Sequence, residues 1–144
     1  MSREIKIRFW DKTTNTMIYP IANYESICIV NGKMKPSLSN SIVDNWNWYK
    51  REYEPLEYTG LKDKNGIEIY EGDIVKIKHF ARYNSELNSV LKISNCEVIY
   101  ENCQFLFHDT YKDDFKYKFD DINCIKNIEV IGNIYENPEL LKED

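Results

Sequence analysis

The chain has 144 residues, a formal net charge of -5, and a composition that is 42% hydrophobic and 14% aromatic. This length predicts one domain, residues 1–144, large enough to bury a core. A mean hydropathy of -0.59 without a long apolar run excludes a membrane-spanning helix. The charged N-terminus lacks the apolar stretch of a secretory signal, so we expect a cytoplasmic protein. The acidic balance argues against phosphate binding by the whole surface.

The first residues alternate in polarity. Ile5, Ile7 and Phe9 are separated by polar or amphipathic residues, which predicts a strand with one buried face. Residues 11–16 are polar and predict a turn, after which residues 17–21 are expected to return as a second strand.

Two Asn-Gly pairs predict tight hairpins, because a type I′ turn needs positive φ at both central residues. Asn31-Gly32 separates a β-prone run at 26–30 from residues 33–35. Asn65-Gly66 precedes an alternating stretch in which Ile67 and Ile69 are expected to share a buried face. A further turn at residues 71–73 then leads into an expected strand over residues 74–78.

An aromatic segment lies between these hairpins. Ile42, Trp46, Tyr49 and Tyr53 recur at helical spacing and predict a short amphipathic helix over residues 42–52. The same segment, with Trp48, would also suit a loop. Aromatic residues at this spacing usually face a core, and a platform for a base or a peptide is the alternative.

The second half of the chain predicts more strands and a final short helix. Strands are expected at residues 91–100, 104–108 and 115–119, the last with Lys116 and Lys118 on its outer face. A last strand is expected over residues 128–135. Asn137 followed by Pro138 then predicts a capped helix over residues 138–142. Cys96, in an apolar run, is expected in the core. The fold predicted is mainly β, either a small SH3-like barrel or a curled antiparallel sheet with one or two short helices.

No catalytic motif stands out in the sequence. The span from Gly60 to Gly66 lacks the Gly-Lys-Ser/Thr of a phosphate-binding loop, and the four cysteines form no CxxC pair. With only two histidines, neither a triad nor a zinc site is favoured. Asp73 and Lys76 are not spaced to share one strand face, as a nuclease site would require. We therefore expect a non-enzymatic protein with no cofactor and no metal.

Three blocks of the sequence resemble the YopX family of phage and prophage proteins. They are IKIRFWD at residues 5–11, the block from TGLKD to YEGDIV at residues 59–75, and VIGNIYENPELL at residues 130–141. The resemblance spans nearly the whole chain, with poor cover between about residues 26 and 48. It implies a bacterial virus or prophage origin, a bacterial host cell, a β-rich fold and a role that is uncharacterised. It supplies no catalytic residues.

Two functional hypotheses follow. The first is a protein-binding or self-assembling module, whose partner is a host or phage protein or another copy of the chain, because tyrosine and tryptophan suit interface cores. The alternative is a small nucleic-acid-binding barrel with a local basic strip, or an acidic mimic of nucleic acid. No membrane partner is expected. The candidate interaction surface comprises Trp46, Trp48, Tyr49, Lys76, Lys78, Lys116 and Lys118.

Overall fold

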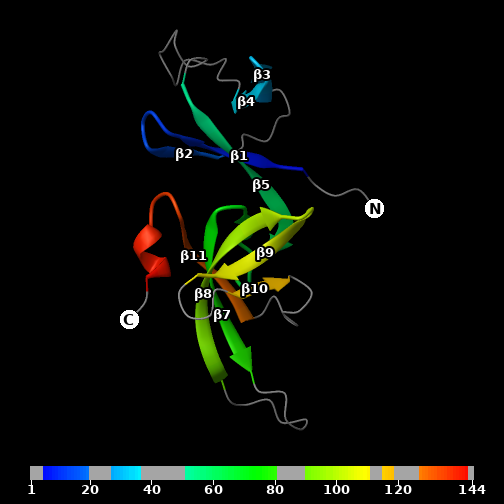
Figure 1. Cartoon of the computed structure of the whole chain (residues 1–144), viewed down its shortest axis with the longest axis vertical. Helices are drawn as coiled ribbons and strands as arrows, with labels where there is room; N and C mark the ends of the chain where they lie inside the picture. Colours follow the sequence, from blue (N-terminus) through cyan, green and yellow to red (C-terminus); the bar gives the residue numbers. More distant parts are fainter. Residues whose placement is uncertain are drawn as a thin grey trace. The chain divides into compact units, whose positions relative to one another are not determined.

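The computed structural model describes residues 5–19, 27–36, 51–80, 90–110, 115–118 and 127–142. In these residues the regular structure is mainly β, as predicted (Figure 1). The chain divides into two compact units, Met1–Tyr58 and Thr59–Asp144, which are described in turn. The elements are β1 (Ile7–Asp11), β2 (Thr16–Ile18), β3 (Ile27–Val30), β4 (Lys33–Pro36), β5 (Tyr53–Lys62), β6 (Glu68–Tyr70), β7 (Asp73–Phe80), β8 (Val90–Glu101), β9 (Gln104–Asp109), β10 (Phe115–Lys118), β11 (Ile128–Asn133) and the 3₁₀ helix η5 (Pro138–Leu141).

In the N-terminal unit, β1 lies between β2 and the first part of β5, and both pairings are antiparallel. Phe9 is buried, and its ring packs edge-on against the ring of Tyr53, with 6.3 Å between the two ring centroids. The prediction of one buried face is wrong, because Arg8 and Trp10 are buried as well, and Ile5 precedes the strand and is exposed. Long amphipathic side chains can bury their stems, so polarity alternation did not identify an exposed face here.

The β3–β4 hairpin confirms the first Asn-Gly prediction. Asn31 and Gly32 both have positive φ, 53° and 76°, and Val30 pairs directly with Lys33. The two strands form a separate two-stranded sheet. The helix expected over residues 42–52 lies outside the described residues except for Arg51 and Glu52, which are not helical.

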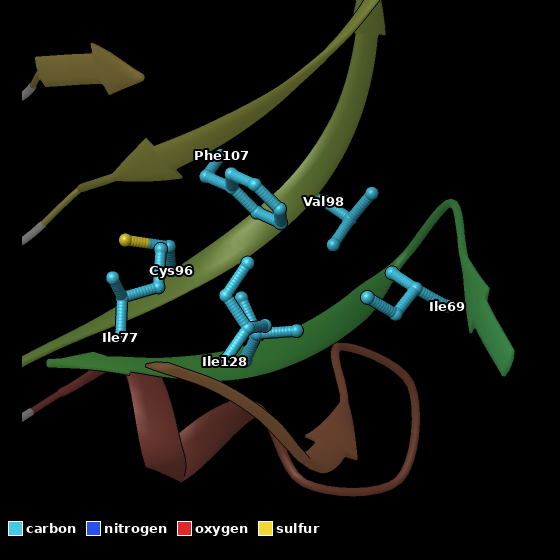
Figure 2. Close-up of a cluster of buried hydrophobic side chains, with 7 residues drawn as sticks. Ile69, Ile77, Cys96, Val98, Phe107 and Ile128 are labelled. Atoms are coloured by element: carbon cyan, nitrogen blue, oxygen red, sulfur yellow. The ribbon is translucent and has the colours of Figure 1, made fainter. Parts of the chain in front are cut away.

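In the C-terminal unit, β10, β9, β8, β7 and β11 form a five-stranded antiparallel sheet in that order. One face of this sheet carries the core, shown in Figure 2. Cys96 is fully buried there, as predicted. Apart from Ile69 on β6, the core residues come from register positions that share one face of the sheet. They are Ile69, Val75, Ile77, Cys96, Val98, Phe107 and Ile128.

The β5–β6 turn bonds to the last strand of the curled sheet. The Lys64 backbone N–H donates to the Ile128 carbonyl at 3.1 Å, and the Val130 N–H donates to Asp63 Oδ2 at 2.9 Å. Gly72 N–H also donates to the Val98 carbonyl at 2.8 Å. The outer edge of β11 is thus covered, which is the arrangement expected of a curled, partly closed sheet.

The turn at Asn65-Gly66 is not the type I′ turn that was predicted. Of the two residues only Gly66 has positive φ, 80°, and Asp63 N–H bonds the Ile67 carbonyl across a three-residue loop. Asp63 Oδ1 accepts hydrogen bonds from the N–H groups of Asn65 and Ile67, which holds the chain in this alternative turn. Ile67 therefore precedes β6 and is 48% exposed, contrary to the buried position expected.

The chain ends in a short helix at the predicted place, but it is a 3₁₀ helix and Asn137 does not cap it. Asn137 Oδ1 instead accepts a hydrogen bond from the Asn133 N–H at 3.3 Å. Asn133 Oδ1 in turn accepts from the N–H groups of Tyr135 and Glu136. The Asn137 side chain thus stabilises the bend after β11 rather than the start of η5.

Candidate interaction surface

The four lysines of the predicted surface lie on one face of the five-stranded sheet. Strand register places Lys76 and Lys78 on β7, and Lys116 and Lys118 on β10, on the face opposite the core. We call this the outer face. Lys78, Lys116 and Lys118 are exposed, and Lys76 is half-buried. Trp46, Trp48 and Tyr49 lie outside the described residues.

Carboxylates lie among these lysines on the outer face. Lys116 Nζ is 2.7 Å from Glu101 Oε2 of β8. Glu129 of β11 is the register partner of Lys76 and bonds to Lys64 Nζ at 3.2 Å. Two strands, β9 and β8, separate β10 from β7. The outer face is therefore of mixed charge and not a continuous basic strip.

A row of register partners crosses the middle of the outer face. It runs from Gly132 on β11 through Ile74 on β7 and Glu97 on β8 to His108 on β9 and Lys116 on β10. Burial raises the pKa of Glu97 above its ordinary value, and the charge of His108 opposes part of that rise. Sequence reasoning did not find this Glu97–His108 pair, because it depends on the register between β8 and β9.

The C-terminal segment folds back over one end of this row. A Cβ placed on Gly132 would lie 2.6 Å from Asn137 Oδ1, so the Asn137 side chain covers Gly132. Further along, Asn95 Nδ2 on β8 donates to the Leu140 carbonyl of η5 at 2.9 Å. Ile74 is on β7, the strand that lies between β11 and β8 in the sheet, and it is 0% exposed although it belongs to the outer face. In Figure 2 the segment after β11, which includes η5, lies on the side of β7 away from the core.

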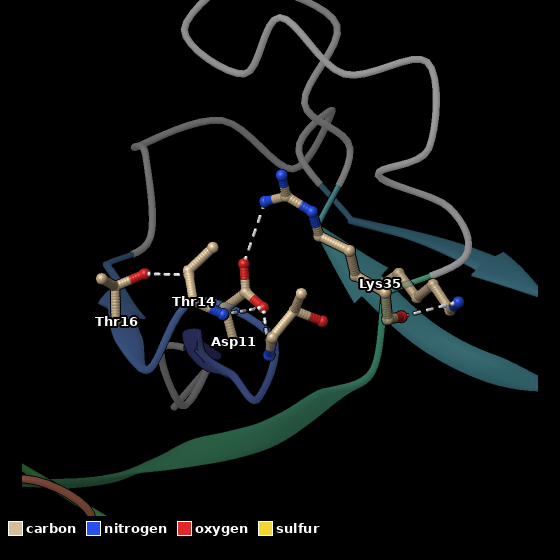
Figure 3. A network of polar contacts seen from close by, with 6 residues as sticks. Asp11, Thr14, Thr16 and Lys35 are labelled. Atoms are coloured by element: carbon tan, nitrogen blue, oxygen red, sulfur yellow. Dashed lines mark hydrogen bonds and ion pairs between the residues drawn. The ribbon is translucent and has the colours of Figure 1, made fainter.

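The N-terminal unit has a network of polar contacts of its own (Figure 3). Asp11, 1% exposed, accepts hydrogen bonds from the N–H groups of Thr13 and Thr14 and from Arg51 at 3.1 Å. Lys35 of β4 donates from Nζ to the Arg51 carbonyl at 3.0 Å. Through Arg51 this network connects the β3–β4 hairpin to β1.

The same hairpin carries an apolar side chain that the sequence analysis did not select. Ile29, in the middle of β3, is 72% exposed. Its register partner Met34 is half-buried on the same face. Strand β3 has the sequence ICIV and contains no charge. In the sequence, the four successive β-prone residues without a charge were the feature that could have indicated a strand with an apolar edge.

Neither a metal cluster nor a membrane-spanning helix is found in the part of the chain that the structure describes. No three His, Cys, Asp or Glu side chains come together there as metal ligands would. None of the helices described there has the length and apolar character needed to cross a bilayer.

The two units define a β-rich protein with a curled antiparallel sheet and without a recognisable catalytic constellation in the described residues. The family model described as YopX protein matches residues 6–142, and the chain belongs to that family. The resemblance noted in the sequence is thereby confirmed.

Two solved structures show the same fold. Protein EF1440 from Enterococcus faecalis is 27% identical, with 97% of this chain and 99% of that chain covered and a TM-score of 0.54. Protein YopX from Bacillus subtilis is 23% identical, with 94% of this chain and 96% of that chain covered and a TM-score of 0.52. No curated protein matches the chain.

Proposed function

We propose that this chain is a non-enzymatic binding module that associates with another protein or with copies of itself. The observation that carries the proposal is the exposure of Ile29, 72%, on an uncharged strand of a two-stranded sheet. Such a strand can add to a strand of a partner, because its backbone groups supply hydrogen bonds and its side chains supply apolar contact.

The hairpin is supported in a way that suits this role. Lys35, one of its residues, is 8% exposed and bonded to the Arg51 carbonyl, whereas Ile29 on the other face is exposed. A two-stranded sheet by itself is marginally stable, so the contact through Lys35 helps to hold the hairpin for binding. The exposed face then remains available for a partner.

Substitution of the exposed isoleucine tests the proposal. The tagged protein is used to recover partners from host lysate with and without nuclease, and its mass in solution is measured at micromolar concentration. We expect Ile29→Lys to abolish the nuclease-resistant association or the self-association. Ile67→Lys, at another exposed isoleucine in the C-terminal unit, is the matched control and should bind normally. Equal association by the Ile29 variant and the parent would contradict the proposal.

Binding of nucleic acid is the second candidate, favoured by the shared face of Lys76, Lys78, Lys116 and Lys118. Phosphate contacts by lysine give affinity that falls steeply with salt. Labelled single-stranded and duplex oligonucleotides should then bind at low salt, and Lys76→Gln with Lys78→Gln should weaken this binding. Absence of binding at low salt would exclude this candidate.

The proposed setting is the cytoplasm of a bacterial host, with a phage or prophage as the source of the chain. The family resemblance in the three sequence blocks supports this origin. Detection of the protein in the soluble fraction of cells carrying the prophage, and its absence from cured cells, is the expected result.

A further inference from the structure

We infer that the partner of the β3–β4 hairpin is a second copy of this chain, and that the two copies pair β3 against β3 across a two-fold axis at Cys28. The outer edge of β3 here means the edge away from β4. This inference rests on the proposed function and deepens it by naming the partner, the edge and the register.

The register of the hairpin decides which backbone groups of β3 face outward. In the described ranges, β3 has one neighbouring strand, β4. Val30 pairs with Lys33 across the two-residue turn, and the residues that flank such a turn are hydrogen-bonded to each other. Hydrogen-bonded and non-hydrogen-bonded pairs alternate along an antiparallel ladder, so Val30 and Cys28 bond to β4. The N–H and C=O groups of Ile27 and Ile29 therefore point to the outer edge.

The other edge of the hairpin does not suit a partner strand. On β4 the groups that point outward belong to Met34 and Pro36, because these are the register partners of the two outward isoleucines. Proline has no N–H to donate, and it protects edge strands from pairing. Two β4 strands placed edge to edge would also bring Lys33 of one copy opposite Lys35 of the other. Of the two edges, that of β3 carries neither proline nor charge.

A two-fold axis restricts how two β3 strands can pair. The axis stands perpendicular to the sheet, so paired residues lie on the same face and differ by an even number of positions. Pairing centred on Cys28 places Ile27 of each copy opposite Ile29 of the other. All the outward backbone groups of both strands are then used, in about four hydrogen bonds. Pairing centred on Ile29 would instead place Ile27 opposite Asn31, whose φ of 53° belongs to the turn.

The sequence of β3 is self-complementary in this register. Residues 27–29, Ile-Cys-Ile, read the same in both directions, so each isoleucine meets an isoleucine. The chain has a net charge of -5, and copies of it repel one another, but pairing through β3 brings no like charges opposite each other. Ile29, now 72% exposed, would lose contact with water. Pairing also converts two two-stranded sheets, each marginally stable by itself, into one sheet of four strands.

The size of the contact sets its strength. Strand β3 has four residues, so the pairing buries less than the roughly 1,200–2,000 Å² of a stable complex. We therefore expect the dimer to exchange with the monomer, and its population to grow as the concentration rises from the micromolar to the millimolar range.

Measurements over a range of concentration test the inference. Sedimentation equilibrium from about 10 μM to about 1 mM should give a mass that rises from that of one chain, 17.2 kDa, toward about twice that value. Over the same range, the hydrogen-exchange protection of the Ile27 and Ile29 amides should increase, while that of the Cys28 and Val30 amides should stay constant. A constant mass, or protection of Ile27 and Ile29 that does not depend on concentration, would overturn the inference.

Two proline variants separate the two edges of the hairpin. Ile29→Pro removes an outward N–H of β3 and leaves the bonds to β4 in place, so we expect it to lose dimerisation. Met34→Pro removes the equivalent outward N–H of β4, and this matched control should dimerise like the parent. Protection of the Val30 amide reports in each variant whether the hairpin is folded. Ile29→Lys keeps every backbone donor and should also lose dimerisation. Dimerisation of either Ile29 variant equal to that of the parent would contradict the inference.

Failure of this inference can be distinguished from failure of the proposed function. If the parent stays monomeric to about 1 mM but Ile29→Lys loses a nuclease-resistant partner from lysate, the second copy is excluded and the binding module remains. If the parent stays monomeric and recovers no such partner, both are excluded.

Discussion

Asp63 accepts a hydrogen bond from the Val130 N–H at 2.9 Å across 67 positions of sequence, and this bond fastens the β5–β6 turn to the last strand. The other oxygen of the same carboxylate accepts from Asn65 and Ile67 within the turn. The side chain is 3% exposed. One carboxylate therefore sets both the local turn and its attachment to β11.

We predict that Asp63→Ala lowers the free energy of unfolding by about 3 kcal/mol, because it leaves three backbone N–H groups without this acceptor. Asp63→Asn keeps one acceptor oxygen and should lose less. Urea denaturation measures both. Lys64→Ala, which removes only a partly exposed ion pair with Glu129, is the control and should change stability by less than about 1 kcal/mol. A loss in Asp63→Ala no greater than in Lys64→Ala would contradict this role.

Gly132 is required by its neighbour. A Cβ at this position would lie 2.6 Å from Asn137 Oδ1, so Gly132→Ala should push the bend after β11 out of place and cost about 1–3 kcal/mol. Thermal unfolding measures the loss. Combination with Asn137→Gly should recover part of the stability, since the clashing side chain is then absent. If the double variant is no more stable than Gly132→Ala, the clash is not the cause.

Ser94 is 2% exposed on the core face of β8, and within the described ranges its hydroxyl has no hydrogen-bond partner. Burial of such a hydroxyl costs free energy that alanine avoids. We expect Ser94→Ala to leave stability unchanged or to raise it by about 1 kcal/mol, measured by urea denaturation. Destabilisation beyond about 1 kcal/mol would show that the hydroxyl has a partner.

The raised pKa of Glu97 predicts a pH dependence of global stability. Since its pKa is higher in the folded than in the unfolded state, Glu97 favours folding at acidic pH, and this contribution is lost as the pH rises through the folded pKa. Glu97→Gln should therefore be more stable than the parent at neutral pH, and the gap should narrow on acidification. Urea titrations at several pH values give both curves; parallel curves would refute the prediction.

Much of the fold could be predicted because local signals agreed with the final structure. The Asn31-Gly32 hairpin and the alternation around Cys96 and Val98 need only turn chemistry and a pleat. The Asn65-Gly66 turn differs from the predicted type I′ turn because the Asp63 carboxylate, which also bonds to β11, stabilises another turn. The turn between β8 and β9 has positive φ at Asn102 and Cys103. Asparagine is common at positive φ but cysteine is not, so the sequence does not indicate the conformation of Cys103.

The candidate surface could be predicted only in part. Alternation places Lys116 and Lys118 on the outer face of their strand, as expected, and they are exposed. Glu101 beside Lys116, and Glu97 beside His108, depend on how three strands align with one another. A sequence does not contain that alignment where strands are long and their turns are unknown.

The order of strands also has a consequence for synthesis of the chain. Strand β11 pairs with β7, although β8, β9 and β10 are made between them. While these are being translated, one edge of β7 has no neighbour from the native sheet, and the core side chain of Ile128 is still missing. The C-terminal unit therefore reaches its native pairing only after Asn133 has left the ribosome. Before that point, the edge of β7 is open to a chaperone or to a second nascent chain.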